Sequence, residues 1–272
     1  MNNLKNQVII VTGGAAGIGG ALTTVLAQRG ASVVAVDINE EAGKKIAGSN
    51  PDQIVFLKGD VSRKSVAEKA VKLAVSKFGK LTGLVNNAHA SRQKPLMEHT
   101  PEDWSLSFGT GFNATLYFMK AAYPELIKQG GSIVNFGSGA GLVGLKEQAS
   151  YAAAKEAIRG LSRVAANEWA MDSIRVNVVC PLALTEGVAN WKEHYPDQFN
   201  QVAGHIPMKR FGDPQEDVAP IVAFLLSEDS RYMTGARSTS NSVMRRDGSI
   251  SMICCCAVSI SRSSVKATLA RS

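Results

Sequence analysis

A tyrosine and a lysine four residues apart can together move a proton. Tyr151 and Lys155 stand in the run YAAAK, and this spacing puts both side chains on one face of a helix. The phenol of a free tyrosine has a pKa of about 10, too high for an efficient base at neutral pH. A neighbouring ammonium group favours the phenolate and lowers that pKa. Ser138, which follows a predicted strand, can bond a substrate oxygen and stabilise charge developing there.

A glycine-rich segment provides a place for a phosphate group. The sequence TGGAAGIG occupies residues 12–19, directly after the first predicted strand and before the first predicted helix, with glycines at 13, 17 and 19. Glycine lets the backbone turn tightly and approach a pyrophosphate, and the helix N-terminus that follows offers free N–H groups. This position in the chain favours a dinucleotide site over a plain turn.

The choice of dinucleotide rests on Asp37, at the end of the second predicted strand. A carboxylate there can accept hydrogen bonds from the adenosine ribose, and it would repel a 2′-phosphate. Ala15, Ala16 and Ile38 supply no cation for such a phosphate. The sequence therefore predicts NAD rather than NADP. Tyr151 would take a hydroxyl proton while the nicotinamide takes the hydride.

Apolar runs rich in valine and isoleucine alternate with amphipathic segments of helical length, which predicts a doubly wound parallel sheet. The strands are continuously apolar, as expected where helices cover both faces of the sheet. The fold class is therefore α/β, one Rossmann-like sheet. The predicted strands are 8–12, 32–37, 54–58, 83–86, 132–136 and 175–179, and the predicted helices are 17–29, 39–48, 62–78, 101–128, 149–171 and 214–227.

Over about residues 4–235 the chain resembles the short-chain dehydrogenases/reductases. The resemblance rests on ordered motifs: TGGAAGIG at 12–19, DV at 60–61, NNA at 86–88, Ser138, YAAAK at 151–155 and RVN at 175–177. It implies an oxidoreductase that moves a hydride between NAD(H) and a secondary alcohol or ketone. Ser138, Tyr151 and Lys155 would be catalytic, with Asn86 supporting the sheet. The implied cofactor-binding residues are Gly13, Gly17, Ile18, Gly19, Asp37, Asp60, Val61, Asn87, Tyr151, Lys155, Pro181 and Thr185.

Three positions depart from the family pattern. Gly111 stands where the family has an asparagine, whose carbonyl anchors a water on the proton path to the lysine. Glycine keeps that carbonyl and permits a helix kink, so we hypothesise that the relay persists with altered geometry. His89 replaces a glycine and would either act as a second acid or base or pack beside the nicotinamide pocket. Leu182 replaces the glycine after Pro181.

Two segments differ in character from the rest. Residues 186–212 are polar and aromatic and long for a connection, which is typical of a substrate lid; Trp191, Tyr195 and Phe199 hint at an apolar or ring-shaped substrate. Beyond Gly235 the chain becomes rich in Ser and Arg. We therefore expect a catalytic domain over 1–235 and an atypical tail over 236–272, from an altered reading frame or a foreign extension. A homotetramer or homodimer is expected if that tail permits.

Composition excludes several function classes. The net charge is +7, but six Lys/Arg and one Asp lie beyond Gly235, so that segment carries +5 and the preceding residues only +2. We therefore expect no nucleic-acid partner. No run approaches the roughly 20 apolar residues of a membrane span, and the N-terminus does not resemble a signal peptide, so a cytoplasmic protein without a membrane partner is expected. Adjacent cysteines 254–256 fit no zinc spacing, and no metal site is expected.

Two rival functions stay open. One is a catalytically impaired regulatory protein that holds NAD without turnover, suggested by Gly111, Leu182 and the tail. The other is an acyl-carrier ketoreductase, which the acidic residue at 37 disfavours because such enzymes usually take NADPH.

Overall fold

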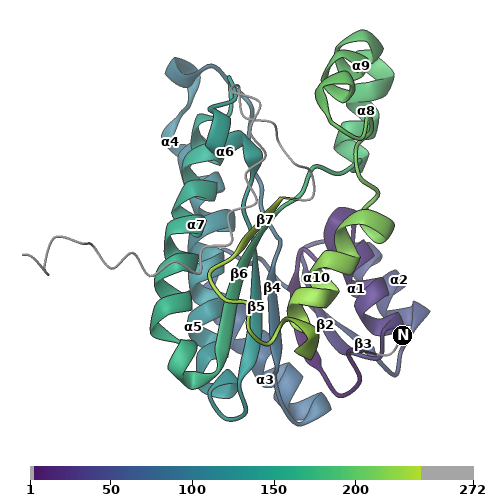
Figure 1. Ribbon diagram of the computed structural model, residues 1–272, viewed down its shortest axis with the longest axis vertical. Helices are drawn as coiled ribbons and strands as arrows, with labels where there is room; N and C mark the ends of the chain where they lie inside the picture. Colours follow the sequence, from purple (N-terminus) through teal and green to yellow (C-terminus); the bar gives the residue numbers. More distant parts are fainter. Residues whose placement is uncertain (1–2, 240–272) are drawn as a thin grey trace, which may run out of the picture.

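The protein forms one seven-stranded parallel sheet in the order β3-β2-β1-β4-β5-β6-β7. The computed structural model describes residues 3–239, apart from the side chains of residues 186, 187, 198 and 239 (Figure 1). This arrangement confirms the predicted Rossmann-like α/β fold. The strands are β1 (Val8–Thr12), β2 (Ser32–Asp37), β3 (Ile54–Lys58), β4 (Gly83–Asn86), β5 (Gly131–Phe136), β6 (Ile174–Cys180) and β7 (Arg237–Thr239).

Helices cover both faces of the sheet (Figure 1). Those packed around the sheet are α1 (Gly17–Gln28), α2 (Glu40–Ser49), α3 (Lys64–Phe78), α5 (Ala114–Leu126), α7 (Ala149–Glu168) and α10 (Ala219–Leu226). Helices α3, α5 and α7 share one apolar core with the sheet, and α1 and α10 share the other. Along β1, Val8 and Ile10 enter the first core, whereas Ile9 and Val11 enter the second. This two-sided burial explains why the strand is continuously apolar.

The remaining elements gather near the carboxyl ends of the strands or connect the main helices. They are α4 (Pro101–Ser107), α6 (Gly139–Val143), α8 (Glu186–His194), α9 (Pro196–His205), the π-helical turns η2 (Phe108–Asn113) and η4 (Pro214–Val218), and the 3-10 turns η1 (Leu96–Glu98), η3 (Ala170–Asp172) and η5 (Glu228–Ser230). In Figure 1, α6, α8 and α9 lie at the same end of the sheet.

Three expectations need correction. The single helix predicted over 101–128 is divided into α4, the π-helical turn η2 and α5, because one turn is wider than an α-helix. The helix predicted over 214–227 likewise begins with the π-helical turn η4 before α10, and α8 and α9 fill most of the segment 186–212 that was expected to be a lid. The sheet also continues past residue 235, because β7 pairs with β6 through Arg237 and Ser238. Most of the expected tail, residues 240–272, which include a short apolar run at 250–260, lies outside the described residues.

The strand order creates the place for a site. β1 lies between β2 and β4, so the chain leaves β1 toward one side of the sheet and later returns to its other side at β4. The loops after β1 and β4 therefore diverge and leave a crevice at the carboxyl end of the sheet. Dinucleotides bind in such crevices in folds of this kind.

Candidate active site

The turn between β1 and α1 is shaped so that a ligand can approach its backbone closely. Gly13 and Gly17 adopt left-handed conformations with φ of +62° and +54°, which L side chains rarely tolerate. A Cβ on Gly19 would lie 1.9 Å from the carbonyl oxygen of Gly13 and 2.6 Å from Nδ2 of Asn87. The amide of Asn87 closes the turn by donating to the carbonyl of Thr12 at 3.0 Å. This compact, side-chain-free cradle fits a pyrophosphate.

A cavity of about 590 Å³ opens beside this turn. It lies where the ends of β1, β2, β3 and β4 meet and therefore occupies the crevice of the sheet. Seven of the residues predicted to bind a cofactor line it: Gly13, Ile18, Asp37, Asp60, Val61, Asn87 and Thr185. The others, Gly17, Gly19, Tyr151, Lys155 and Pro181, are not among its lining residues. The cavity thus joins residues that are far apart in the sequence.

Two carboxylates lie along the cavity wall. Asp37 accepts backbone hydrogen bonds from Ala15 at 3.1 Å and Asn39 at 3.0 Å, so the glycine-rich turn and β2 hold it in place. Asp60 accepts from the backbone and hydroxyl of Ser62 at 2.9 and 2.7 Å. No lysine or arginine lines this cavity among the described residues. The wall therefore presents carboxylate oxygens and negative charge to the cavity.

Lys155 is buried on α7 with only 4% of its surface exposed. Its ammonium donates to the carbonyl of Phe136, at the end of β5, at 2.9 Å. Burial lowers the pKa of Lys155 to about 8. The same ammonium lies 5.6 Å from the centre of the Tyr151 ring, so the predicted pair does share one helix face.

The pKa of Tyr151 differs from the sequence-based expectation. Its pKa is raised above that of a free tyrosine because burial of the phenol outweighs its hydrogen bond with Ser138, which acts in the opposite direction. We expected Lys155 to lower this pKa; instead its ammonium is held by the Phe136 carbonyl and has itself lost basicity. Ser138 caps α6 by accepting from the backbone of Ala140 at 3.1 Å, which fixes its hydroxyl beside Tyr151.

His89 lies against the other side of this group. Its ring centre is 4.8 Å from that of Tyr151, and its Nε2 is 2.9 Å from the hydroxyl of Ser107 at the end of α4. Burial, with a smaller contribution from Lys155, lowers the pKa of His89 to about 3. The ring is therefore neutral at physiological pH, which opposes a role as a second general acid. Gly111, in η2, lies directly beside it.

Asn86 belongs to a buried hydrogen-bonded chain rather than to the cavity. It donates from β4 to Asn135 of β5 at 2.8 Å, and Asn135 donates to Ser162 of α7 at 2.9 Å. Ser162 in turn donates to the carbonyl of Ile158 at 2.7 Å. This chain fixes α7, and with it Tyr151 and Lys155, against the sheet.

An ion cluster that was not foreseen from the sequence anchors the loop at 89–98. The carboxylate of Asp103 is fully buried and binds Arg92 at 2.9 Å and Lys94 at 2.8 Å. These hydrogen bonds and the backbone of Thr100 hold the pKa of Asp103 well below its usual range. The backbone of Lys94 also donates to Glu147 at 3.0 Å, next to α7. The Thr100–Asp103 capping box was the available sequence signal.

The lid aromatics mainly pack against each other. Phe199 is buried, with ring centres 5.0 Å from Phe211 and 5.6 Å from Trp191. Tyr195, by contrast, is 56% exposed. Two of the three lid aromatics singled out in the sequence thus form the lid's own small core.

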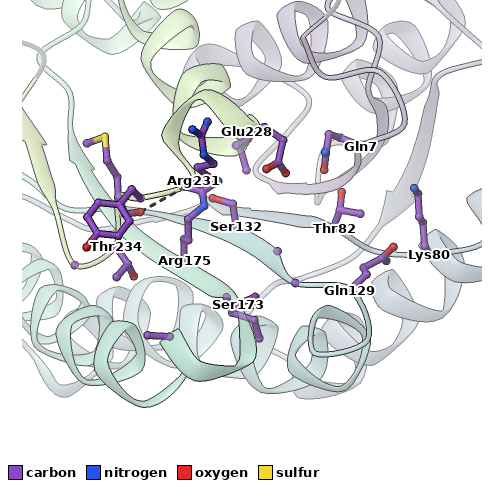
Figure 2. Close-up of a pocket in the computed structure, with 18 of the residues that line it drawn as sticks. Gln7, Lys80, Thr82, Gln129, Ser132, Ser173, Arg175, Glu228, Arg231 and Thr234 are labelled. Carbon is purple, nitrogen blue, oxygen red and sulfur yellow. Dashed lines mark hydrogen bonds between the residues drawn. The ribbon is translucent and has the colours of Figure 1, made fainter.

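A larger concavity of about 1230 Å³ lies at the amino ends of the strands, opposite the smaller cavity (Figure 2). Several of its polar groups are already used by the fold. Ser132 donates to the carbonyl of Leu225 at 2.7 Å, Thr82 donates to that of Val8 at 3.2 Å, and Arg175 donates to that of Ser227 at 3.1 Å. We therefore assign the chemistry to the smaller cavity.

Neither a membrane-spanning helix nor a metal-binding cluster occurs among the described residues. None of the helices there has the length and apolar character needed to cross a bilayer. Within the same residues, no cluster of three His, Cys, Asp or Glu side chains is arranged to hold a metal ion.

Comparisons with known proteins agree with the fold. A family model described as enoyl-(acyl carrier protein) reductase matches residues 13–242. The 12α-hydroxysteroid dehydrogenase of Clostridium sp. is 42% identical over 250 residues, covering 88% of this chain and 96% of that protein. The cyclohexanol dehydrogenase of Acinetobacter sp. is 38% identical, covering 87% and 94%. The solved structure of NAD⁺-bound xylitol dehydrogenase has a TM-score of 0.81 and 28% identity, covering 88% and 98%.

Proposed function

The chain belongs to the short-chain dehydrogenase/reductase family of oxidoreductases, and we propose that it transfers a hydride between NAD(H) and a secondary alcohol or ketone. The observation that carries this proposal is the buried ammonium of Lys155, which lies 5.6 Å from the centre of the Tyr151 ring on the same face of α7. Ser138, Tyr151 and Lys155 are the proposed catalytic residues. His89, which contacts Tyr151, also lines the cavity, so this group lies next to the proposed cofactor site.

NAD is the proposed cofactor. Its pyrophosphate would be held by the turn of Gly13, Gly17 and Gly19, where Gly13 and Gly17 have positive φ and a Cβ on Gly19 would collide with backbone. Asp37 would bind the adenosine ribose, and Asp60 with Val61 would flank the adenine. Ile18, Asn87, Pro181, Thr185, Tyr151 and Lys155 complete the proposed set. The bound nicotinamide supplies hydride acceptance or donation.

The protein's own part is proton transfer and orientation. Burial keeps the phenol of Tyr151 protonated in neutral solution, so it is ready to donate a proton to a ketone oxygen. In the oxidation direction the phenolate takes the proton of the alcohol. Ser138 holds the substrate oxygen, and Lys155 carries positive charge below its pKa of about 8. Held by the Phe136 carbonyl, this ammonium keeps the pair in a fixed arrangement on one face of α7.

Reaction rates in the two directions should respond oppositely to pH. Ketone reduction consumes the phenol proton, so its kcat/KM should be higher at neutral than at alkaline pH. Alcohol oxidation needs the phenolate, whose formation burial opposes, so its kcat/KM should rise steadily into the alkaline range. Both profiles can be measured from NADH absorbance. Oxidation that slows with increasing pH over this range would contradict Tyr151 as the base.

The variant Asp37→Asn should weaken the preference for NAD over NADP. Asparagine keeps an acceptor oxygen for the backbone of Ala15 but removes the charge that would repel a 2′-phosphate. We expect the ratio of kcat/KM values for NAD and NADP to fall at least about tenfold, equivalent to about 1.4 kcal/mol. The control is Asp52→Asn, an exposed carboxylate outside the cavity. An unchanged ratio would contradict the assignment of Asp37.

The proposed substrate is an apolar alicyclic secondary alcohol. Leu142, Val143 and Leu145 expose apolar surface in and just after α6, next to Ser138, and Leu184 and Met208 do so near the lid. Such surface at a site mouth favours apolar ligands. Two relatives are named for hydroxysteroid and cyclohexanol substrates, which supports the same class.

The deciding experiment follows NADH formation with a panel of hydroxysteroids, cyclohexanol and short linear secondary alcohols. We expect turnover with the cyclic substrates and faster oxidation of them than of the linear ones. The rival is a regulatory protein that binds NAD without turnover, favoured by the replacement at Gly111. NAD binding measured by calorimetry, without NADH formation from any alcohol or NADH consumption with the matching ketones, would establish the rival and overturn the proposal.

A further inference from the structure

Two departures from the family pattern meet in space. His89 lies in the loop after β4 and Gly111 in the π-helical turn η2, 22 residues later. A Cβ on Gly111 would lie 2.9 Å from Cε1 of His89 and 3.1 Å from each of its ring nitrogens. The imidazole therefore occupies the space into which any side chain at position 111 would project. An asparagine there requires the ring to leave.

The imidazole cannot leave without losing contacts on other elements. Its Nε2 is hydrogen-bonded to Ser107 of α4, whose side chain is fully buried. Its ring also lies against Tyr151 of α7, tilted by 31°. The ring thus connects the loop after β4, the α4–η2 junction and the helix that carries the proposed catalytic pair.

The ring is also uncharged and without a second polar partner. Its Nδ1 is buried and has no hydrogen-bond partner among the described residues. The titratable groups around the Tyr151 phenol are Lys155 of α7, Cys180 of β6 and His89 itself. A neutral ring over the phenol excludes water from that face without adding a competing charge.

We propose that His89 is a positioning residue for Tyr151 and that His89 and Gly111 form an interdependent pair. The ring of His89 fills the volume that a side chain at position 111 would take, and it holds one face of the phenol at a fixed distance and away from water. This inference rests on the proposed function, because it assigns the role through Tyr151. The hypothesis that the proton relay persists at Gly111 with altered geometry is separate and stays a prediction.

The test is a double-mutant cycle on the full chain with His89→Gly, Gly111→Asn and the double variant. Each single variant should lower kcat about tenfold to 100-fold with little change in KM for the alcohol, since misplacing a reacting group by about 1 Å costs that much. The double variant should recover to within about tenfold of the parent, because the asparagine then has room. If the losses of kcat simply add in the double variant, the proposed interdependence of His89 and Gly111 is wrong.

A second comparison separates positioning from proton transfer by His89. His89→Phe keeps a flat ring against Tyr151 but has no ring nitrogen. We expect its kcat to exceed that of His89→Gly about tenfold or more. In His89→Gly the alkaline rise of oxidation should begin at lower pH, because water reaches the phenol. A Phe variant as slow as the Gly variant, or an unmoved pH profile, would overturn the positioning role.

A failure of the proposed function can be distinguished from a failure of the proposed interdependence of His89 and Gly111. If the parent turns over no alcohol, that function fails, and the same four proteins are compared by thermal melting instead. If His89 and Gly111 are interdependent, Gly111→Asn should lower the melting temperature in the parent but not in the His89→Gly background. Equal lowering in both backgrounds would overturn the pair on structural grounds alone.

Discussion

Replacing Tyr151 with phenylalanine is expected to lower kcat by a factor between about 100 and 10,000, the range over which a positioned general acid or base acts. The change removes one oxygen and leaves the ring contacts with His89 and the Lys155 ammonium available. NAD affinity should therefore fall far less than kcat. The loss would appear in kcat and in kcat/KM for the alcohol alike, because the missing interaction acts in the transition state.

The control for this variant is Tyr232→Phe. Tyr232 is 95% exposed and lies near the amino ends of the strands, away from the smaller cavity, so losing its hydroxyl should leave the rate unchanged. Activity is followed by NADH absorbance, and NAD affinity by calorimetry. If Tyr151→Phe keeps a rate close to that of the parent, the proton must travel through another group and the proposed mechanism is wrong.

Replacing Gly19 with alanine is expected to abolish tight NAD binding. The added Cβ would lie 1.9 Å from the carbonyl oxygen of Gly13, and backbone cannot rotate away as a long side chain can. The turn would have to open, and the pyrophosphate would lose its close contact with the backbone. We expect NAD affinity to fall at least about tenfold. Overpacking of this kind costs about 1–3 kcal/mol of stability.

The matched control is Gly160→Ala in α7, where an added Cβ meets nothing within 4 Å. Alanine is favoured over glycine inside a helix by about 1 kcal/mol, so this variant should be as stable as the parent or more so. Calorimetric titration with NAD and thermal melting distinguish the two variants. A Gly19→Ala protein that binds NAD as tightly as the parent would contradict the phosphate cradle.

Strand positions were largely predictable from the sequence. The bounds expected for 8–12, 32–37, 54–58 and 83–86 match β1 to β4. β1, β2 and β4 are buried on both faces, and each is an apolar run that ends where polar or turn-forming residues begin, whereas β3 at the sheet edge is only partly buried. The glycine-rich turn was predictable for a related reason, because tight backbone approach allows no other residue type at Gly19.

The helix predicted over 101–128 shows the limit of local patterns. An apolar period close to that of an α-helix cannot reveal one widened π-turn inside it, and η2 lies in the middle of this segment. Its environment depends on His89 and on the buried Ser107, which belong to different elements. The local sequence pattern predicts an α-helix throughout this segment. The structure has α-helix in α4 and α5 at its two ends, but a π-helical turn in η2 at its centre.

The sequence by itself determined the sheet, the phosphate-binding turn and the chemical types of Ser138, Tyr151 and Lys155, because each depends on residues close together in the chain. Only the tertiary structure decided how those groups titrate and what surrounds them. The pKa of Tyr151 rises because residues from separate elements exclude water from the phenol, and the pairing of His89 with Gly111 exists only once η2 lies against the loop after β4. Burial is a property of the packed chain, and no spacing along the sequence records it.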